Sequence, residues 1–113
     1  MHELSIAMNI IDIAEEYLNK SDAGKIVEIE IEIGELSGVI PEALDFAMNN
    51  AVSDTVLDNA KINIVIVKGI AKCKLCSEEF AMNQAYTPCP KCEEYNSEIT
   101  AGKEMRIKSL LVE

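Results

Sequence analysis

Four cysteines in the second half of the chain are spaced as ligands of a single metal ion. They form two CxxC pairs, CKLC and CPKC, separated by twelve residues, and they are Cys73, Cys76, Cys89 and Cys92. Two residues between thiolates let one tight turn place both sulfurs about 2.3 Å from one ion, and two such turns complete a tetrahedron. Zinc is the ion we expect. Because four thiolates leave no position for water, the site is expected to be structural rather than catalytic.

Other uses of these cysteines are consistent with the spacing alone. Iron can take the same four-sulfur geometry, and a redox role for one CxxC pair would leave the second pair unexplained. A zinc ribbon that binds nucleic acid is common, but acidic residues outnumber basic ones around the cysteines: Glu78, Glu79, Glu93, Glu94 and Glu98. This local charge argues against nucleic acid as the ligand. The alternative function that we keep is a zinc-stabilised protein-interaction or nucleic-acid-binding module, and a small redox protein is a third.

The amino terminus, Met1-His2-Glu3, is the second place where residue types predict chemistry. His2 is the only histidine among the 113 residues. Its imidazole, its own amide nitrogen and the α-amine of Met1 can close two fused chelate rings around one ion, and nitrogen donors in a plane suit Ni(II) or Cu(II). Glu3 adds the next amide and a carboxylate. A simpler interpretation of Glu3 is a carboxylate that favours the amino terminus of a helix, and the two uses are compatible.

Two helices are predicted from apolar residues at helical spacing. The first covers residues 4–18, and its apolar positions include Leu4, Ala7, Met8, Ile11, Ala14 and Leu18. Only a narrow polar stripe remains, so we expect this helix to be covered over most of its girth, with a sheet on one side. Pro41 suits the first turn of the second helix, whose apolar face is formed by Leu44, Ala47, Met48 and Ala51.

Three strands are predicted from alternation and β-propensity. The first follows Gly24, with Val27, Ile29, Ile31 and Ile33 on one face and Glu28, Glu30 and Glu32 on the other. The others cover about residues 61–68 and 104–112. These elements predict an α+β fold with a small mixed sheet of about three strands and two helices. We expect residues 70–101 to form an inserted zinc-ribbon-like domain. Residues 1–69 and 102–113 would then form the α/β domain, to which the amino-terminal metal site would belong.

Charge complementarity predicts how two of the strands are arranged. Arg106 and Lys108 lie on the last strand, whereas the polar face of the first strand is acidic. Oppositely charged residues on neighbouring strands stabilise a ladder. We therefore expect the last strand to lie beside the first.

Composition limits the classes of partner and the compartment. Hydrophobic residues make up 49% of the chain, which can therefore bury a core, and the formal net charge is −10. Such a charge is repelled by phosphate backbones and anionic membrane surfaces, so we expect neither nucleic acid nor membrane as a partner. The amino terminus has no basic region, and no apolar run approaches the roughly 20 residues that span a bilayer. We expect a cytoplasmic protein.

Three stretches of the chain resemble the HypA family of nickel metallochaperones. They are MHELSIA at the start, IGELSGVIPEALDFA in the middle, and the two CxxC pairs separated by twelve residues. The resemblance covers essentially the whole chain. Its most specific parts are the initial Met-His-Glu and the spaced cysteines.

The resemblance implies a non-enzymatic protein that delivers Ni(II) for [NiFe]-hydrogenase maturation, and in some members for urease. Nickel would be held by Met1, His2 and Glu3, and structural Zn(II) by the four cysteines. The implied partners are the GTPase HypB and the hydrogenase large subunit precursor, and a homodimer is compatible with the family. One departure concerns the loop near residue 40, where some members have an Asp and this chain has Val39, Ile40 and Pro41.

Overall fold

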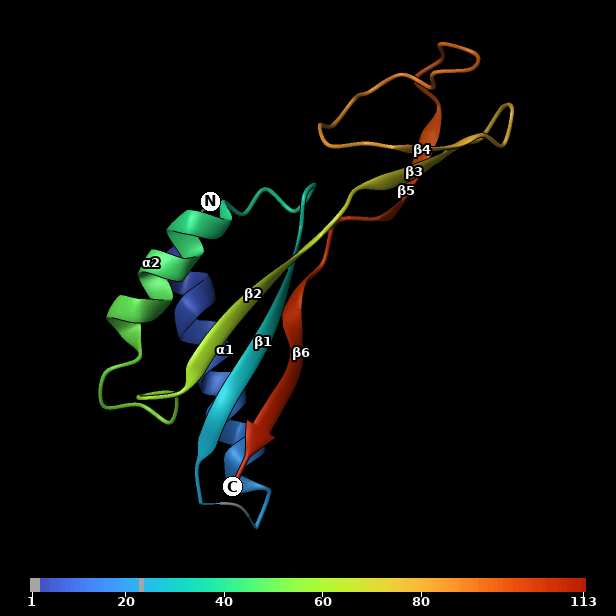
Figure 1. Ribbon diagram of the computed structural model, residues 1–113. Coiled ribbons are helices and arrows are strands. Elements are labelled where there is room, and N and C mark those ends of the chain that lie inside the picture. The colour runs from blue at the N-terminus through green and yellow to red at the C-terminus, as the bar shows by residue number, and fades with distance from the viewer. Residues whose placement is uncertain (1–2, 23) are drawn as a thin grey trace.

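The computed structural model describes residues 3–22 and 24–113 and contains two three-stranded sheets joined end to end (Figure 1). The first sheet has the strand order β2-β1-β6, from β1 (Ile26–Gly34), β2 (Lys61–Val67) and β6 (Met105–Val112). The second has the order β4-β3-β5, from β3 (Ile70–Cys73), β4 (Glu79–Ala81) and β5 (Ser97–Ala101). The molecule is elongated, measuring 54 × 26 × 17 Å.

The first sheet is mixed, and helices α1 (Glu3–Asn19) and α2 (Pro41–Ala51) lie against one of its faces (Figure 1). Strand β1 is central, parallel to β2 and antiparallel to β6. This confirms the predicted α+β class, the two helices and the three-stranded mixed sheet. The division into two domains at residues 70 and 101 stays a prediction.

Strand β1 supplies the centre of the main core. Ile29, Ile31 and Ile33 have no exposed surface, as the alternation predicts. The prediction was wrong at one position: Ile26 is buried, whereas Val27 is only half-buried. A register shift against β6 between Ile26 and Glu28 accounts for the difference, because an extra residue in one strand interrupts the alternation of the two faces.

Helix α1 packs on the sheet through a narrower face than the sequence predicts. Its buried residues are Ala7, Ile10, Ile11 and Ala14. Leu4 and Met8 are each 57% exposed, so the expectation that this helix is covered over most of its girth was wrong. The sheet and α2 cover only one side of α1, and an apolar stripe faces outward.

Helix α2 follows the prediction closely. It begins at Pro41, which stands in its first turn, and it buries Leu44, Ala47 and Met48. Ala51, its last residue, is half-buried. None of the helices in residues 3–22 and 24–113 has the length and apolar character needed to cross a membrane.

The polar side chains of β1 are paired with those of the neighbouring strands. Arg106 on β6 lies opposite Glu32, and its Nε donates to Glu32 Oε1 at 2.8 Å. This confirms that the last strand neighbours the acidic strand. Lys108 has no partner in the register, because a shift occurs there between the Ser109 and Ile107 pairings.

The two sheets meet where three glycines lie close together. A side chain at Gly34 would collide with the carbonyl oxygen of Gly102, and one at Gly69 would collide with the carbonyl oxygen of Met82. Leu36, just after β1, packs against the small core of the second sheet. The junction is therefore packed backbone against backbone, and it holds the second sheet at one end of the first.

Candidate metal centre

The first CxxC pair lies on a tight turn that follows β3. The amide of Ser77 donates to the carbonyl of Cys73 at 3.0 Å, and the amide of Cys73 donates to the carbonyl of Glu78 at 2.8 Å. Ser77 has a φ of 64°, in the left-handed region. This conformation turns the chain back after Cys76, so both sulfurs of the pair face the same side.

The second CxxC pair repeats this turn in a segment with no regular secondary structure between β4 and β5. The amide of Glu93 donates to the carbonyl of Cys89 at 2.8 Å, and the amide of Cys89 donates to the carbonyl of Glu94 at 2.9 Å. Glu93 has a φ of 63°. Two independent segments therefore adopt the same geometry, each immediately after the second cysteine of its pair.

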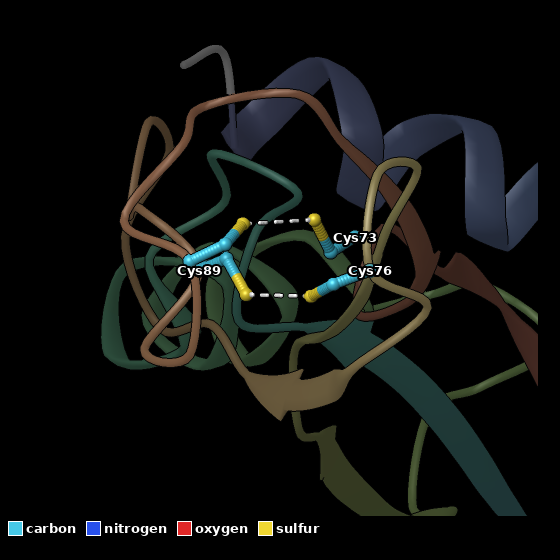
Figure 2. Close-up of side chains that lie close together, drawn as sticks. Cys73, Cys76 and Cys89 are labelled. Carbon is cyan, nitrogen blue, oxygen red and sulfur yellow. Dashed lines mark hydrogen bonds between the residues drawn. The ribbon is translucent and has the colours of Figure 1, made fainter.

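The structure brings the four predicted cysteines together at one point. All four Sγ atoms lie within 4.8 Å of one another. The sulfurs of Cys73 and Cys92 are 3.5 Å apart, and those of Cys76 and Cys89 are 3.6 Å apart (Figure 2). A tetrahedron with metal–sulfur bonds of about 2.3 Å has edges of about 3.8 Å. The sulfur arrangement therefore fits a single four-coordinate zinc ion.

The cysteine cluster is shielded from water and forms much of a small core. Cys73 and Cys89 are buried, and Cys76 and Cys92 are half-buried. Phe80 and Met82 are among the apolar residues buried with them. Such an environment leaves little access for a water or substrate ligand, which is typical of a structural zinc site.

Proton affinities within the cluster are unequal. Hydrogen bonds, first from the Cys76 amide and then from the Leu75 amide and the neighbouring thiols, lower the pKa of Cys73 from 9.0 to about 6, against the opposing effect of burial. The Glu94 amide acts in the same direction on Cys92, but burial and the neighbouring thiols raise the pKa of Cys92 to about 12. Without a cation, the cluster therefore does not carry four thiolates at neutral pH. A bound divalent ion would offset the negative charge of the thiolates and allow all four to ionise.

The predicted nickel ligands are placed only in part. Met1 and His2 lie outside the described residues. Glu3 is the first residue of α1, where its carboxylate favours the helix terminus. Its Oε2 accepts a hydrogen bond of 3.4 Å from the amide of Ile40, which immediately precedes α2. The loop before α2 therefore lies beside the first residue of α1, a contact that the sequence did not predict because the two residues are 37 positions apart.

In residues 3–22 and 24–113, the four cysteines are the one group of three or more His, Cys, Asp or Glu side chains placed to hold a metal ion together. The many carboxylates of β1 do not form such a group. Glu28, Glu30 and Glu32 instead accept hydrogen bonds from Asn63, Ser109 and Arg106 on the neighbouring strands.

Comparisons with known proteins agree over nearly the whole chain. Residues 1–112 match the family described as "Hydrogenase/urease nickel incorporation, metallochaperone, hypA". A relative named "Hydrogenase maturation factor HypA" from Parabacteroides distasonis is 40% identical over 99% of this chain and 97% of the relative. A protein of the same name from Geobacter metallireducens is 38% identical over 100% of both chains. The solved structure titled "Solution structure of the Ni metallochaperone HypA from Helicobacter pylori" matches with a TM-score of 0.71 and 35% identity, over 99% of this chain and 97% of that chain.

Proposed function

The chain belongs to the HypA family of nickel-incorporation metallochaperones, and from this premise we propose that it binds Ni(II) through Met1, His2 and Glu3. We propose further that it passes the ion on for the maturation of [NiFe]-hydrogenase, without a catalytic step of its own. The match to a nickel-incorporation family over residues 1–112 is the observation that carries this proposal.

Three features of the chain support the amino terminus as the nickel site. The four cysteines form a closed, sulfur-only cluster that fits zinc, so a transported ion needs different ligands. His2 is the single imidazole of the sequence, and imidazole is a preferred donor for nickel. Glu3 is the nearest carboxylate in the sequence, and its side chain is already held beside the loop that ends at Ile40.

Each ligand has a defined role in the proposal. The α-amine of Met1, the amide nitrogen of His2 and the His2 imidazole form two fused chelate rings in one plane. Glu3 adds its amide nitrogen or its carboxylate. Near residue 40, where some family members have an Asp, this chain has Val39, Ile40 and Pro41, so the proposal takes no side-chain ligand from these three residues.

Nickel release follows from proton competition. Binding displaces protons from the amine, the imidazole and an amide, so nickel affinity falls as the pH falls. Ligands at a chain terminus are also accessible to an acceptor, whereas a buried cage would have to open first. The nitrogen donors of the site therefore select nickel, and an acceptor with competing ligands can remove the ion from it.

We assign Zn(II) to Cys73, Cys76, Cys89 and Cys92, where it would stabilise the second sheet. The partners in the proposal are the GTPase HypB and the hydrogenase large subunit precursor, and the protein would act in the cytoplasm. A homodimer is compatible with this scheme but is not required by it.

Metal stoichiometry tests the proposal directly. Zinc-loaded wild type should bind one Ni(II) in equilibrium dialysis, and His2→Ala should lose most of that binding while its zinc content stays unchanged. Acetylation of the amino terminus, or its extension by a few residues, should weaken nickel binding about as much, because an amide is far less basic than an amine. An acetylated protein with unchanged nickel affinity would exclude the α-amine as a ligand. Unchanged affinity in His2→Ala would overturn the site as a whole.

A further inference from the structure

The outward-facing stripe of α1 borders a hollow that we call the α1 groove. Leu4, Met8 and Ile11 line it from α1, and Ala51 lines it from the end of α2. Its volume is 370 Å³. Of these residues, Ile11 is buried, whereas Leu4 and Met8 are each 57% exposed. An open apolar hollow of this kind is typical of a binding surface.

The α1 groove has the length of a short helix. Its lining residues on α1 run from Leu4 to Glu15, which at 1.5 Å per residue is about 16 Å, or three helical turns. A groove between helices that accepts apolar side chains at helical spacing is a recurring mode of peptide recognition. Met8, with its flexible side chain, suits a surface that adapts to a partner.

The charge around the groove is acidic. Asp12 and Glu15 form its rim, and neither makes an ion pair in the described part of the chain. Helices α1 and α2 together contain six acidic residues, four in α1 and two in α2, and no basic residue. A ligand with an apolar face flanked by positive charges would therefore complement both the apolar lining and the acidic rim of the groove.

We propose that the α1 groove docks an amphipathic helix of a partner protein, in which two or three large apolar side chains are flanked by lysine or arginine. A second copy of this chain paired by two-fold symmetry is disfavoured, because it would bring the carboxylates of Asp12 and Glu15 in the two copies together. An anionic membrane surface is disfavoured by the same charge.

The groove begins at Leu4, directly after Glu3, so a docked partner would lie beside the start of α1 and, in the sequence, two residues from His2. This inference does not depend on nickel binding there. If both hold, the groove positions the partner that receives or supplies the ion. Docking and nickel binding can therefore fail separately.

A labelled model peptide tests the docking. The probe is a helical peptide of about 15 residues, or four turns, with leucines on one face and lysines at its edges. A matched peptide carries glutamates in place of the lysines. In fluorescence anisotropy, the lysine peptide should bind the zinc-loaded protein and the glutamate peptide should not.

Variants of exposed residues locate the binding. Met8→Gln should weaken the lysine peptide about fivefold or more, whereas Met105→Gln, at an exposed methionine on β6, should have no effect. Glu15→Lys should weaken it about three- to tenfold at low salt and less at high salt. The matched control Glu16→Lys makes the same change of charge at a neighbour that does not line the groove, so it should have a smaller effect.

Three outcomes would overturn the proposal. One is no binding of the lysine peptide at about 1 mM, the limit of weak recognition. Another is an equal loss in Glu15→Lys and Glu16→Lys, which would indicate attraction to net charge alone. The third is dimerisation of the free protein that Glu15→Lys abolishes, which would assign the groove to a second copy. Loss of nickel binding in His2→Ala, measured on the same samples, should leave peptide affinity unchanged.

Discussion

Removal of zinc should unfold the second sheet and leave the first sheet intact. Apart from the ligands, the buried side chains of the second sheet are Ala71, Phe80 and Met82. Burial of a large apolar side chain contributes about 1.5–3 kcal/mol, so Phe80 and Met82 together give about 3–6 kcal/mol. Structural zinc sites in small domains contribute about 10–16 kcal/mol. The metal is therefore the larger source of stability in the second sheet.

The main core does not depend on the metal. It is built from α1, α2 and the first sheet, with Ile29, Ile31 and Ile33 at its centre, and it contains no cysteine. A chelator, or the substitution Cys73→Ser, should therefore act on one sheet only. Leu75→Ala is the matched control, because Leu75 lies between two ligands and is 61% exposed.

Amide hydrogen exchange separates the two sheets. In the zinc-free protein, the amides of Ala71 and Phe80 should lose protection by several orders of magnitude, and those of Ile29 and Ile31 should keep it. Leu75→Ala should behave as wild type with full zinc content. Retained protection at Ala71 without zinc would show that the metal does not hold this sheet. Loss of protection in both sheets would show that the predicted domains at residues 70–101 and in the rest of the chain are a single unit.

Three further predictions concern particular residues. Arg106→Glu should lower the midpoint of thermal unfolding at low salt, because it replaces an ion pair by two like charges, and the loss should be smaller at high salt. Lys108→Glu should have less effect, because Lys108 has no partner in the register. Glu93→Gly should stabilise the zinc-loaded protein by about 0.5–1 kcal/mol, since its φ of 63° strains a residue with a Cβ, whereas Glu94→Gly should not be stabilising. Zinc binding at pH 7 should release at least one proton, because burial and the neighbouring thiols raise the pKa of Cys92 to about 12 without metal and its proton must leave. Calorimetric titration in buffers of different ionisation enthalpy measures the number of protons released. Zinc affinity should accordingly rise when the titration is repeated at higher pH.

The fold was predictable wherever one local pattern determines one face of an element. The alternation in β1 identified Ile29, Ile31 and Ile33 as core residues, and Pro41 marked the start of α2. The error at Val27 comes from a register shift, which depends on the partner strand and has no signal within β1 itself.

The exposed stripe of α1 shows a different limit. Leu4 and Met8 have the same helical spacing as buried residues, so periodicity alone assigned them to the core. Whether these residues are buried depends on how many elements pack around α1. One small sheet and one short helix cover only one side of it. Periodicity identifies an apolar face but does not say whether that face meets the core or a partner.

The metal centre was predictable because its geometry is local. Two residues between cysteines require a tight turn, and both pairs adopt that turn with the same backbone hydrogen bonds. The contact between Glu3 and Ile40 was not predictable, because it depends on how α1 and α2 pack. No motif in either segment indicates that the loop before α2 lies beside the first residue of α1.

The junction between the sheets determines how far a loss of zinc should spread. The carbonyl of Gly69 accepts from the amide of Met82, which follows β4, and the Gly69 amide donates to Glu35 Oε1 at 2.7 Å. The amide of Leu36 donates to the carbonyl of Gly102 at 2.7 Å. The contacts of Glu35 and Leu36 join the turn after β1 to Gly69 and Gly102, which lie in the two segments that connect the sheets. Loosening of the second sheet should therefore reach Gly69 and Gly102. Beyond them, β1 pairs along its length with β2 and β6, and the core under these strands contains no metal ligand, so unfolding should stop at these two glycines.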